Sequence, residues 1–229
     1  MDPDRCSTGI ASVDRLLGGG LETDSLTEIY GEGGSGKTLF CLQVALRVSL
    51  ENRWVFYIDT EGVSVDRLRA IAGENLDRVL KRWLLSTPKN LTEQANAVET
   101  ACALARDGQR PVGLLVVDSG TFYYRLSLSG PDEDDARQAL SLSVADLLST
   151  ALQAHLPVLF TNQVWRNMRD GSLEALGGSF LNHAAKTILR FDRLPGARRR
   201  VVLVKHRSLP EGSAEFRIGP TGLESVGPG

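Results

Sequence analysis

Residues 31–38 read Gly-Glu-Gly-Gly-Ser-Gly-Lys-Thr and carry the strongest chemical signal in the chain. They fit the pattern G-x-x-x-x-G-K-T, in which backbone N–H groups of a glycine-rich loop surround phosphate oxygens. In such a loop Lys37 reaches the β- and γ-phosphates, and the Thr38 hydroxyl is a ligand of Mg²⁺. The alternative is a glycine-rich turn without a ligand, but an apolar run precedes the motif and a helical pattern follows it. We expect the nucleotide to be held by Gly31, Glu32, Gly33, Gly34, Ser35, Gly36, Lys37, Thr38 and Leu39.

Three polar side chains, Asp118, Glu61 and Gln163, follow other apolar runs that we predict to be strands. In open parallel sheets, ligands bind outside the carboxyl ends of the strands. Asp118 comes directly after Leu-Leu-Val-Val, and at that position it would hold the water shell of Mg²⁺ opposite Thr38. The alternative for Asp118 is an Asp that caps a turn or a helix.

Glu61 and Gln163 are candidates for the chemistry of hydrolysis. A carboxylate at a strand end can orient and deprotonate the attacking water, which is the role we predict for Glu61. The alternative is a Glu that satisfies backbone N–H groups at the start of a helix. Gln163 can sense the γ-phosphate by hydrogen bonding and pass its state to the next loop. A buried amide that holds two strand ends together is the alternative for Gln163.

The elements that must position these residues alternate between strand and helix, which predicts an α/β fold with a mostly parallel sheet covered on both faces. Residues 187–194 and 199–206 are predicted to form a hairpin across Pro195-Gly196, which extends one edge antiparallel. Residues 165–178 have no clear period and are predicted to be a mobile loop, and residues 79–85 are ambiguous. The predicted strands are 26–30, 54–58, 114–117, 158–160 and 215–218. The predicted helices are 7–20, 37–50, 65–72, 91–106, 131–155 and 180–185, the first of them capped by Ser7 or Thr8.

Composition narrows the class of protein. A chain of 229 residues with no linker-like stretch predicts one domain, 1–229, in which residues 1–25 form a short lead-in. The formal net charge of −2 does not indicate nucleic acid, so a nucleic-acid site would have to be a local patch. Three scattered cysteines argue against a zinc site or a disulfide framework. We see neither a membrane span nor a signal peptide, and we therefore expect a cytoplasmic protein.

Several ordered motifs together resemble the RecA/RadA recombinase superfamily. Ser7-Thr8-Gly9 and Leu16 to Gly20 are similar to the S-T-G…L-L-G-G-G lead-in of that family. Asp59 to Gly62, Val117-Asp118-Ser119 and Thr161 to Val164 are similar to its catalytic-Glu, Walker B and switch segments. Gly177-Gly178 with His183-Ala184 resembles the end of its second DNA loop. Residues 205–212, Lys-His-Arg-Ser-Leu-Pro-Glu-Gly, look like the short archaeal paralogues of RadA. The resemblance covers about residues 7–224.

The resemblance implies a RecA-like P-loop core that binds ATP and Mg²⁺ and assigns roles by position. Glu61 would be the water-activating base, and Gln163 would be the nucleotide-sensing switch. Arg67 would lie against the adenine, for which a stacked guanidinium is suitable chemistry, unless it is a solvated helix Arg. Lys205 and Arg207 match a K-x-R pair that reaches the γ-phosphate of the neighbouring subunit. Because positions i and i+2 of a strand share a face, both could point at one phosphate; an exposed basic strand edge is the alternative.

Departures from the family pattern concern DNA binding and assembly. Only six residues precede Ser7, so we expect neither the N-terminal DNA-binding domain nor the Phe-x-x-Ala polymerisation tether of the recombinases. The first DNA loop keeps Arg125 and Arg137, but residues 132–135 are all acidic and oppose a phosphate backbone. The second loop offers Trp165, Arg166, Asn167 and Arg169, an aromatic beside cations that suits single-stranded DNA. That loop could equally have no ligand, and a solvated turn is the favoured interpretation of Arg198-Arg199-Arg200.

We therefore predict an ATP-binding protein of DNA repair and homologous recombination, an accessory or mediator to the main recombinase, with slow hydrolysis. Its expected partners are the main archaeal recombinase or other repair proteins, together with single-stranded DNA, and self-association is open. One rival hypothesis is a RecA-like regulatory ATPase of the KaiC type, which acts on proteins without DNA. A second is a non-hydrolysing interaction module in which ATP only sets conformation. A small-molecule kinase is remote, because the long second loop does not suit a lid over a small substrate.

Overall fold

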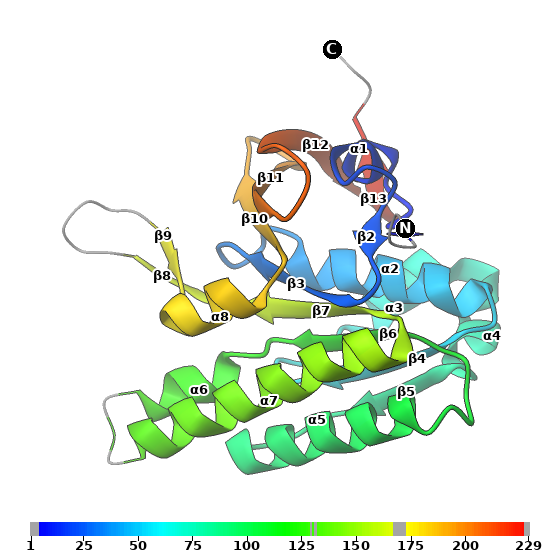
Figure 1. Cartoon of the computed structure of the whole chain (residues 1–229). Coiled ribbons are helices and arrows are strands. Elements are labelled where there is room, and N and C mark those ends of the chain that lie inside the picture. Colours follow the sequence, from blue (N-terminus) through cyan, green and yellow to red (C-terminus); the bar gives the residue numbers. More distant parts are fainter. Residues whose placement is uncertain (1–4, 129, 131, 167–172, 227–229) are drawn as a thin grey trace.

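A central sheet organises the molecule (Figure 1). The computed structural model describes residues 5–128, 130, 132–166 and 173–226. Nine of the strands within these residues form one sheet in the order β13-β12-β11-β10-β3-β7-β6-β4-β5. They are β3 (Ser25–Tyr30), β4 (Trp54–Asp59), β5 (Trp83–Ser86), β6 (Val112–Asp118), β7 (Pro157–Asn162), β10 (Thr187–Arg193), β11 (Arg198–His206), β12 (Gly212–Gly219) and β13 (Gly222–Ser225).

The sheet is parallel from β10 to β5 and antiparallel from β10 to β13, as the sequence predicts. The parallel strands are continuous apolar runs because both of their faces are buried. β10 and β11 form the predicted hairpin across Pro195-Gly196. Two small antiparallel pairs lie outside this sheet. They are β1 (Arg5–Cys6) with β2 (Leu21–Glu22), and β8 (Val164–Arg166) with β9 (Leu173–Ala175).

Helices cover both faces of the sheet and bury two separate apolar cores. β4 shows the division, because Val55 and Tyr57 belong to one core while Phe56 and Ile58 belong to the other. This alternation is the two-residue period of a strand. Figure 1 shows α5 and α7 side by side on one face, with α2 and α4 on the other. The helices are α1 (Ala11–Leu16), α2 (Lys37–Leu50), α3 (Val65–Ala72), α4 (Leu76–Leu80), α5 (Leu91–Arg106), α6 (Phe122–Ser127), α7 (Glu133–Ala154) and α8 (Gly178–Ala184), with the 3-10 turn η1 (Gly73–Asn75). None of the described helices is long and apolar enough to cross a membrane.

Most predicted boundaries agree with the structure, and α2, α3 and α5 have the predicted ends. The first helix is shorter than predicted, and neither Ser7 nor Thr8 caps it. Both hydroxyls instead donate to the carboxylate of Asp14, at 2.7 Å each, because the chain turns back before the helix begins.

Two segments differ in kind from the prediction. The ambiguous residues 79–85 divide between α4 and β5. The predicted loop 165–178 contains most of β8, all of β9 and the first residue of α8, with Trp165 paired to Glu174 across the β8–β9 ladder. Short strands of this kind leave no periodic pattern, because few of their side chains are buried.

Candidate nucleotide site

A cavity of about 450 Å³ lies at the carboxyl ends of the parallel strands. It brings together the predicted loop residues, the predicted metal ligands and both candidates for hydrolysis chemistry. Its lining consists of Gly31, Gly33, Gly34, Gly36, Lys37, Thr38, Leu39, Glu61, Arg67, Asp118, Arg125, Gln163, Val164 and Ile218. Glu32 and Ser35, also predicted to hold nucleotide, lie in the same loop but not in the lining. The Ser35 side chain is fully buried.

The glycine-rich loop takes its shape from close packing at one side and open space at the other. Gly31 has φ +153°, and a Cβ there would lie 2.2 Å from the carbonyl oxygen of Phe191. Gly36 has φ +102° and begins α2, which places the first N–H groups of that helix at the cavity. A Cβ added at Gly33 or Gly34 would meet nothing within 4 Å. The loop is therefore fixed where Gly31 packs against β10 and open at Gly33 and Gly34, which leaves space for phosphates.

Lys37 extends along this loop rather than into solvent. Its ammonium donates to the carbonyl oxygens of Gly31, at 2.7 Å, and Glu32, at 3.2 Å. Burial lowers the pKa of Lys37, and the carboxylates of Asp118 and Glu61 oppose that shift. A half-buried cation beside a concave row of N–H groups fits a polyphosphate.

Asp118 is the buried acid of the site, with 4% of its surface exposed. It accepts hydrogen bonds from the hydroxyls of Tyr57, at 2.7 Å, and Thr161, at 2.6 Å. Burial raises the pKa of Asp118, while hydrogen bonds from Thr161, Tyr57 and Thr38 oppose the rise. The Thr38 hydroxyl and the Asp118 carboxylate thus lie together, and oxygen donors of this type suit Mg²⁺. Mg²⁺ keeps several of its own waters, so a site with few protein ligands fits it.

Glu61 and Gln163 contact each other directly across two strand ends. The Gln163 amide donates to Glu61 Oε1 at 2.8 Å. Glu61 does not satisfy the backbone N–H groups around it, because Asp59 accepts those of Glu61, Gly62 and Val63 at 2.6–3.2 Å. The helix-start alternative for Glu61 is therefore wrong. The alternative for Gln163 is partly right, since its amide does join two strand ends, although at the cavity.

Gln163 also joins the cavity to the β8–β9 pair. Its N–H donates to the Thr121 hydroxyl at 3.0 Å, and its carbonyl accepts from the Leu176 N–H at 3.1 Å. The preceding Asn162 donates to both the Leu176 carbonyl and the buried carboxylate of Glu28, at 2.6 and 2.7 Å. One polar network therefore connects β3, β7 and the end of the second loop.

Two arginines, Arg67 and Arg125, line the nucleotide cavity. Arg67 donates to the carbonyls of Gly219, at 3.0 Å, and Pro220, at 3.3 Å, so it is not simply a solvated helix residue. It forms a side wall with the end of β12, and its contact with adenine stays a prediction. Arg125, predicted to bind DNA, lies on α6 and lines the nucleotide cavity. Sequence reasoning missed α6, so it placed Arg125 in a loop.

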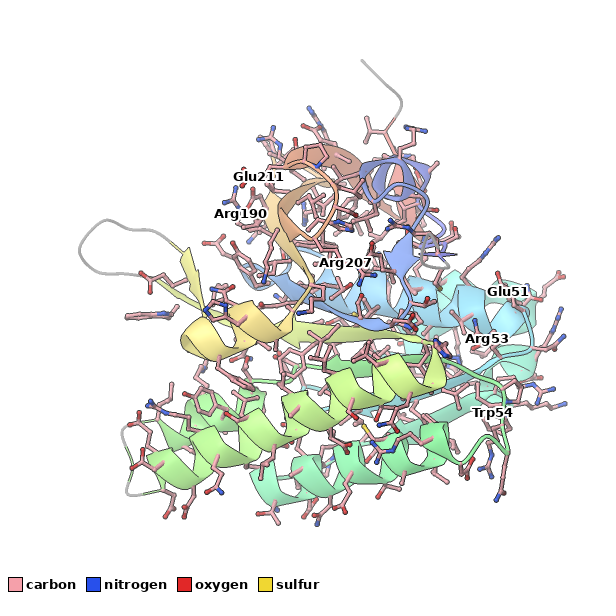
Figure 2. The ribbon with its side chains drawn as sticks, in the orientation of Figure 1. Glu51, Arg53, Trp54, Arg190, Arg207 and Glu211 are labelled. Carbon is pink, nitrogen blue, oxygen red and sulfur yellow. The ribbon has the colours of Figure 1, made fainter. Side chains whose placement is uncertain are left out.

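Lys205 and Arg207 do not line the cavity, and their side chains bind different neighbours. β11 ends at His206, so the strand period that would align the two residues is interrupted. Lys205 donates to the carbonyls of Asn182 and Ala185 at the end of α8, at 2.5 and 2.9 Å, where a cation is favourable. Arg207, labelled in Figure 2, forms an ion pair with the buried Glu22 of β2 at 2.7 Å. The joint action of Lys205 and Arg207 on the γ-phosphate of a neighbouring subunit stays a prediction.

The predicted DNA residues are scattered. Arg137 forms an i,i+4 ion pair with Glu133 on α7 at 2.9 Å, which reduces its charge toward DNA. Trp165 is 51% exposed on β8, as a stacking platform would be. Arg166 ends β8, while Asn167 and Arg169 lie outside the described residues.

Sequence reasoning missed three residues that support the site, namely Asp59, Tyr57 and Thr161. Asp59 has a local signal, because an Asp followed closely by Gly is typical of a turn in which the carboxylate accepts backbone N–H groups. Tyr57 and Thr161 have none. Their hydroxyls reach Asp118 across neighbouring strands, and strand order cannot be read from the sequence of a single strand.

The sheet, the loop and the cavity together define a protein with a RecA-like core and a P-loop. The family model described as Rad51 matches residues 5–226. A DNA repair and recombination protein RadB from Methanoculleus marisnigri is 42% identical over 227 residues, which cover 99% of this chain and 100% of the relative. RadB from Thermoplasma acidophilum is 38% identical over 225 residues, with 97% and 95% covered. A crystal structure of the RadB recombinase superposes with a TM-score of 0.81 at 36% identity, covering 96% of this chain and 99% of that one. The chain belongs to the Rad51 family, within its RadB proteins of DNA repair and recombination.

Proposed function

We propose that this protein binds and slowly hydrolyses ATP as an accessory to the main recombinase in homologous recombination. The observation that carries the proposal is the single cavity in which the loop, Lys37, Asp118, Glu61 and Gln163 converge. Each of these side chains has a structural reason to be where it is, through bonds to loop carbonyls, neighbouring hydroxyls or one another.

The proposed reaction is in-line attack of water on the terminal phosphate, and the chain supplies binding, charge and proton transfer. Residues 31–39 would hold the phosphates, and Lys37 would stabilise the charge that develops on them. Glu61 would orient the water and take its proton, while Gln163 keeps the Glu61 carboxylate in place. Thr38 and Asp118 would hold Mg²⁺, which when bound neutralises phosphate charge.

A second surface supports the accessory role. An apolar groove of about 490 Å³ lies between the edge strand β5 and α5. Leu84 and Leu85 of β5 are 37% and 56% exposed beside it, and Phe56, Ile58 and Ala101 form part of its floor. An unpaired strand edge beside an apolar groove suits an extended segment with an aromatic side chain. The Phe-x-x-Ala segment that the resemblance gives the recombinases has this chemistry, so we propose that a recombinase docks here.

Single-stranded DNA is the second proposed partner. Trp165, Phe180 and Leu126 are exposed on β8, α8 and α6, which Figure 1 shows at the same end of the molecule. Base stacking on Trp165 contributes about 1–3 kcal/mol in comparable sites, independent of base identity. DNA that stacks on Trp165 should quench the fluorescence of this exposed tryptophan. The buried Trp83 is the internal control, because DNA cannot stack on it.

The test of the function measures ATP turnover by the protein alone, with single-stranded DNA, and with the recombinase of the same organism. We expect slow turnover alone and a rise when the recombinase is added. Lys37→Ala should abolish nucleotide binding and also the rise in ATP turnover that the recombinase causes. Turnover by a demonstrated monomer equal to that of an assembled recombinase would contradict the proposal. If Lys37→Ala still binds the recombinase as the unaltered protein does, the interaction-module hypothesis is favoured. If single-stranded DNA changes neither binding nor ATP turnover, the KaiC-type hypothesis is favoured.

A further inference from the structure

Arg199 is the middle residue of the basic run 198–200, and it behaves unlike its neighbours. Arg198 and Arg200 are half exposed and form ion pairs with Glu215 across the β11–β12 ladder. Arg199 points to the opposite face of β11 and is only 9% exposed. The expectation of a solvated turn is therefore wrong for Arg199.

The guanidinium of Arg199 binds backbone carbonyls, and one of them belongs to the P-loop. Its Nε donates to the Gly34 carbonyl at 3.1 Å. Its Nη1 donates to the carbonyls of Gly196, at 3.1 Å, and Arg198, at 2.7 Å, within its own hairpin. The planar fork of an arginine thus ties the tip of the β10–β11 hairpin to the outer side of the loop.

The hydrogen bond from Arg199 to Gly34 can orient one peptide unit of the loop. In a trans peptide unit the C=O and N–H point in opposite directions. The unit between Gly34 and Ser35 is held at both ends, because Arg199 binds its C=O and the Glu32 carbonyl accepts its N–H at 3.2 Å. Gly36 follows directly and begins α2, so this peptide unit fixes how the chain enters the helix whose first N–H groups face the cavity.

Other contacts from the antiparallel edge support the same part of the loop. A Cβ on Gly36 would lie 3.6 Å from the Phe216 ring and 3.7 Å from Ile218, and Gly31 packs against the carbonyl of Phe191. These contacts are apolar or steric and limit how far the loop can move. The hydrogen bond from Arg199 differs from them because it is directional.

We propose that Arg199 is a positioning residue of the nucleotide site, which orients the Gly34–Ser35 peptide unit so that the loop N–H groups converge on the phosphates. This inference rests on the proposed binding of ATP and deepens it. The ligand recognised through Arg199 is the polyphosphate chain, not the base, because the guanidinium donates its hydrogen bonds to the phosphate-binding loop and to its own hairpin.

The experiment compares Arg199→Met and Arg199→Lys with the matched control Arg200→Met, which removes a charge from the other face of the same strand. Affinity is measured with N-methylanthraniloyl-ATP, and with inorganic tripolyphosphate as competitor, at a temperature where circular dichroism shows each variant folded. We expect Arg199→Met to bind both about tenfold more weakly, since the directional hydrogen bond to the Gly34 carbonyl of the loop is lost. Arg199→Lys should recover part of the loss, because a cationic donor remains, and Arg200→Met should stay within about twofold of the unaltered protein.

Three outcomes would overturn the inference. If Arg199→Met binds nucleotide within twofold of the unaltered protein, the inference about Arg199 is wrong, while the proposed function still stands. Weaker binding of the labelled ATP with unchanged tripolyphosphate binding would place the effect at the base. Absence of nucleotide binding by the unaltered protein would remove the proposed function and this inference with it. If Arg199→Met does not fold, the same comparison is made with Arg199→Lys, for which about threefold weaker binding is expected.

Discussion

Glu61 and Gln163 form the contact on which the proposed chemistry depends. The carboxylate is exposed at the cavity, its loop is held by Asp59, and the Gln163 amide binds one of its oxygens. This arrangement engages one carboxylate oxygen, and in the proposed reaction the other oxygen would bind the attacking water.

Replacing Glu61 by Gln should separate binding from hydrolysis. Glu61→Gln keeps the size of the side chain but cannot accept a proton, so we expect turnover to fall by about 10²–10⁴ while ATP affinity changes less than about threefold. The measurement is single-turnover hydrolysis beside equilibrium binding of ATP. Glu74→Gln, on the exposed turn η1, is the control. Full turnover by Glu61→Gln would exclude Glu61 as the base.

Glu28 is a buried acid in the centre of the sheet, 1% exposed, and it faces Asn162 and the cation of Lys205. Burial raises the pKa of Glu28 from 4.5 to about 7. The folded protein therefore holds this proton more tightly than the unfolded chain does. The stability that the neutral acid contributes is complete below pH 4.5 and is lost as the pH rises through about 7.

Glu28→Gln should remove this part of the pH dependence. Each pH unit between the two pKa values corresponds to about 1.4 kcal/mol, so the unaltered protein should lose on the order of 3 kcal/mol between pH 4.5 and 8 relative to Glu28→Gln. Urea unfolding of both proteins from pH 4.5 to 8 checks the difference. A constant difference across that range would show that Glu28 does not titrate in this window.

At the scale of elements, the P-loop depends on the strand that packs behind it. Gly31 has φ +153°, and Gly31→Ala would place a Cβ 2.2 Å from the carbonyl oxygen of Phe191. Relieving this clash requires a shift of the β10 backbone, which costs free energy. We expect a loss of about 2 kcal/mol or more in unfolding free energy without nucleotide. Gly33→Ala, which enters open space, should change it by less than about 0.5 kcal/mol. Equal effects of the two substitutions would contradict this account.

Elements with many buried apolar residues could be predicted from the sequence, and so could the ligands at their ends. The central strands, α2 and α5 are of this kind, and Asp118, Glu61 and Gln163 follow from the rule that ligands bind at strand ends. What could not be predicted depends on contacts between distant segments. Arg199 appears as one of three arginines in a turn, and only the pairing of β11 with β10 and β12 places it behind Gly34. The end of β11 at His206, which separates Lys205 from Arg207, also depends on that pairing.

At the scale of the whole molecule, the nucleotide cavity and the β5–α5 groove are lined by different residues and can be tested apart. Leu85→Glu places a charge in the groove, and we expect it to weaken binding of the recombinase at least tenfold. ATP affinity and thermal stability should stay unchanged. Leu152→Glu, on the 53% exposed Leu152 of α7, is the matched control. The measurement is titration calorimetry with the recombinase of the same organism, and tight binding by Leu85→Glu would place the partner elsewhere.

The carboxyl ends of β4, β6 and β7 are joined crosswise beneath the cavity. Thr60 donates its N–H to the Asp118 carbonyl, its hydroxyl accepts the N–H of Ser119, and Gly120 donates to the Thr161 carbonyl, each at 2.9 Å. Each bond joins the ends of two neighbouring strands, and Thr60, Ser119 and Gly120 are all buried, so breaking one of these bonds requires buried strand ends to separate. We therefore expect the amide protons of Thr60, Ser119 and Gly120 to exchange with solvent deuterium only when the whole domain unfolds. The floor of the nucleotide site would then be among the last parts of the molecule to open.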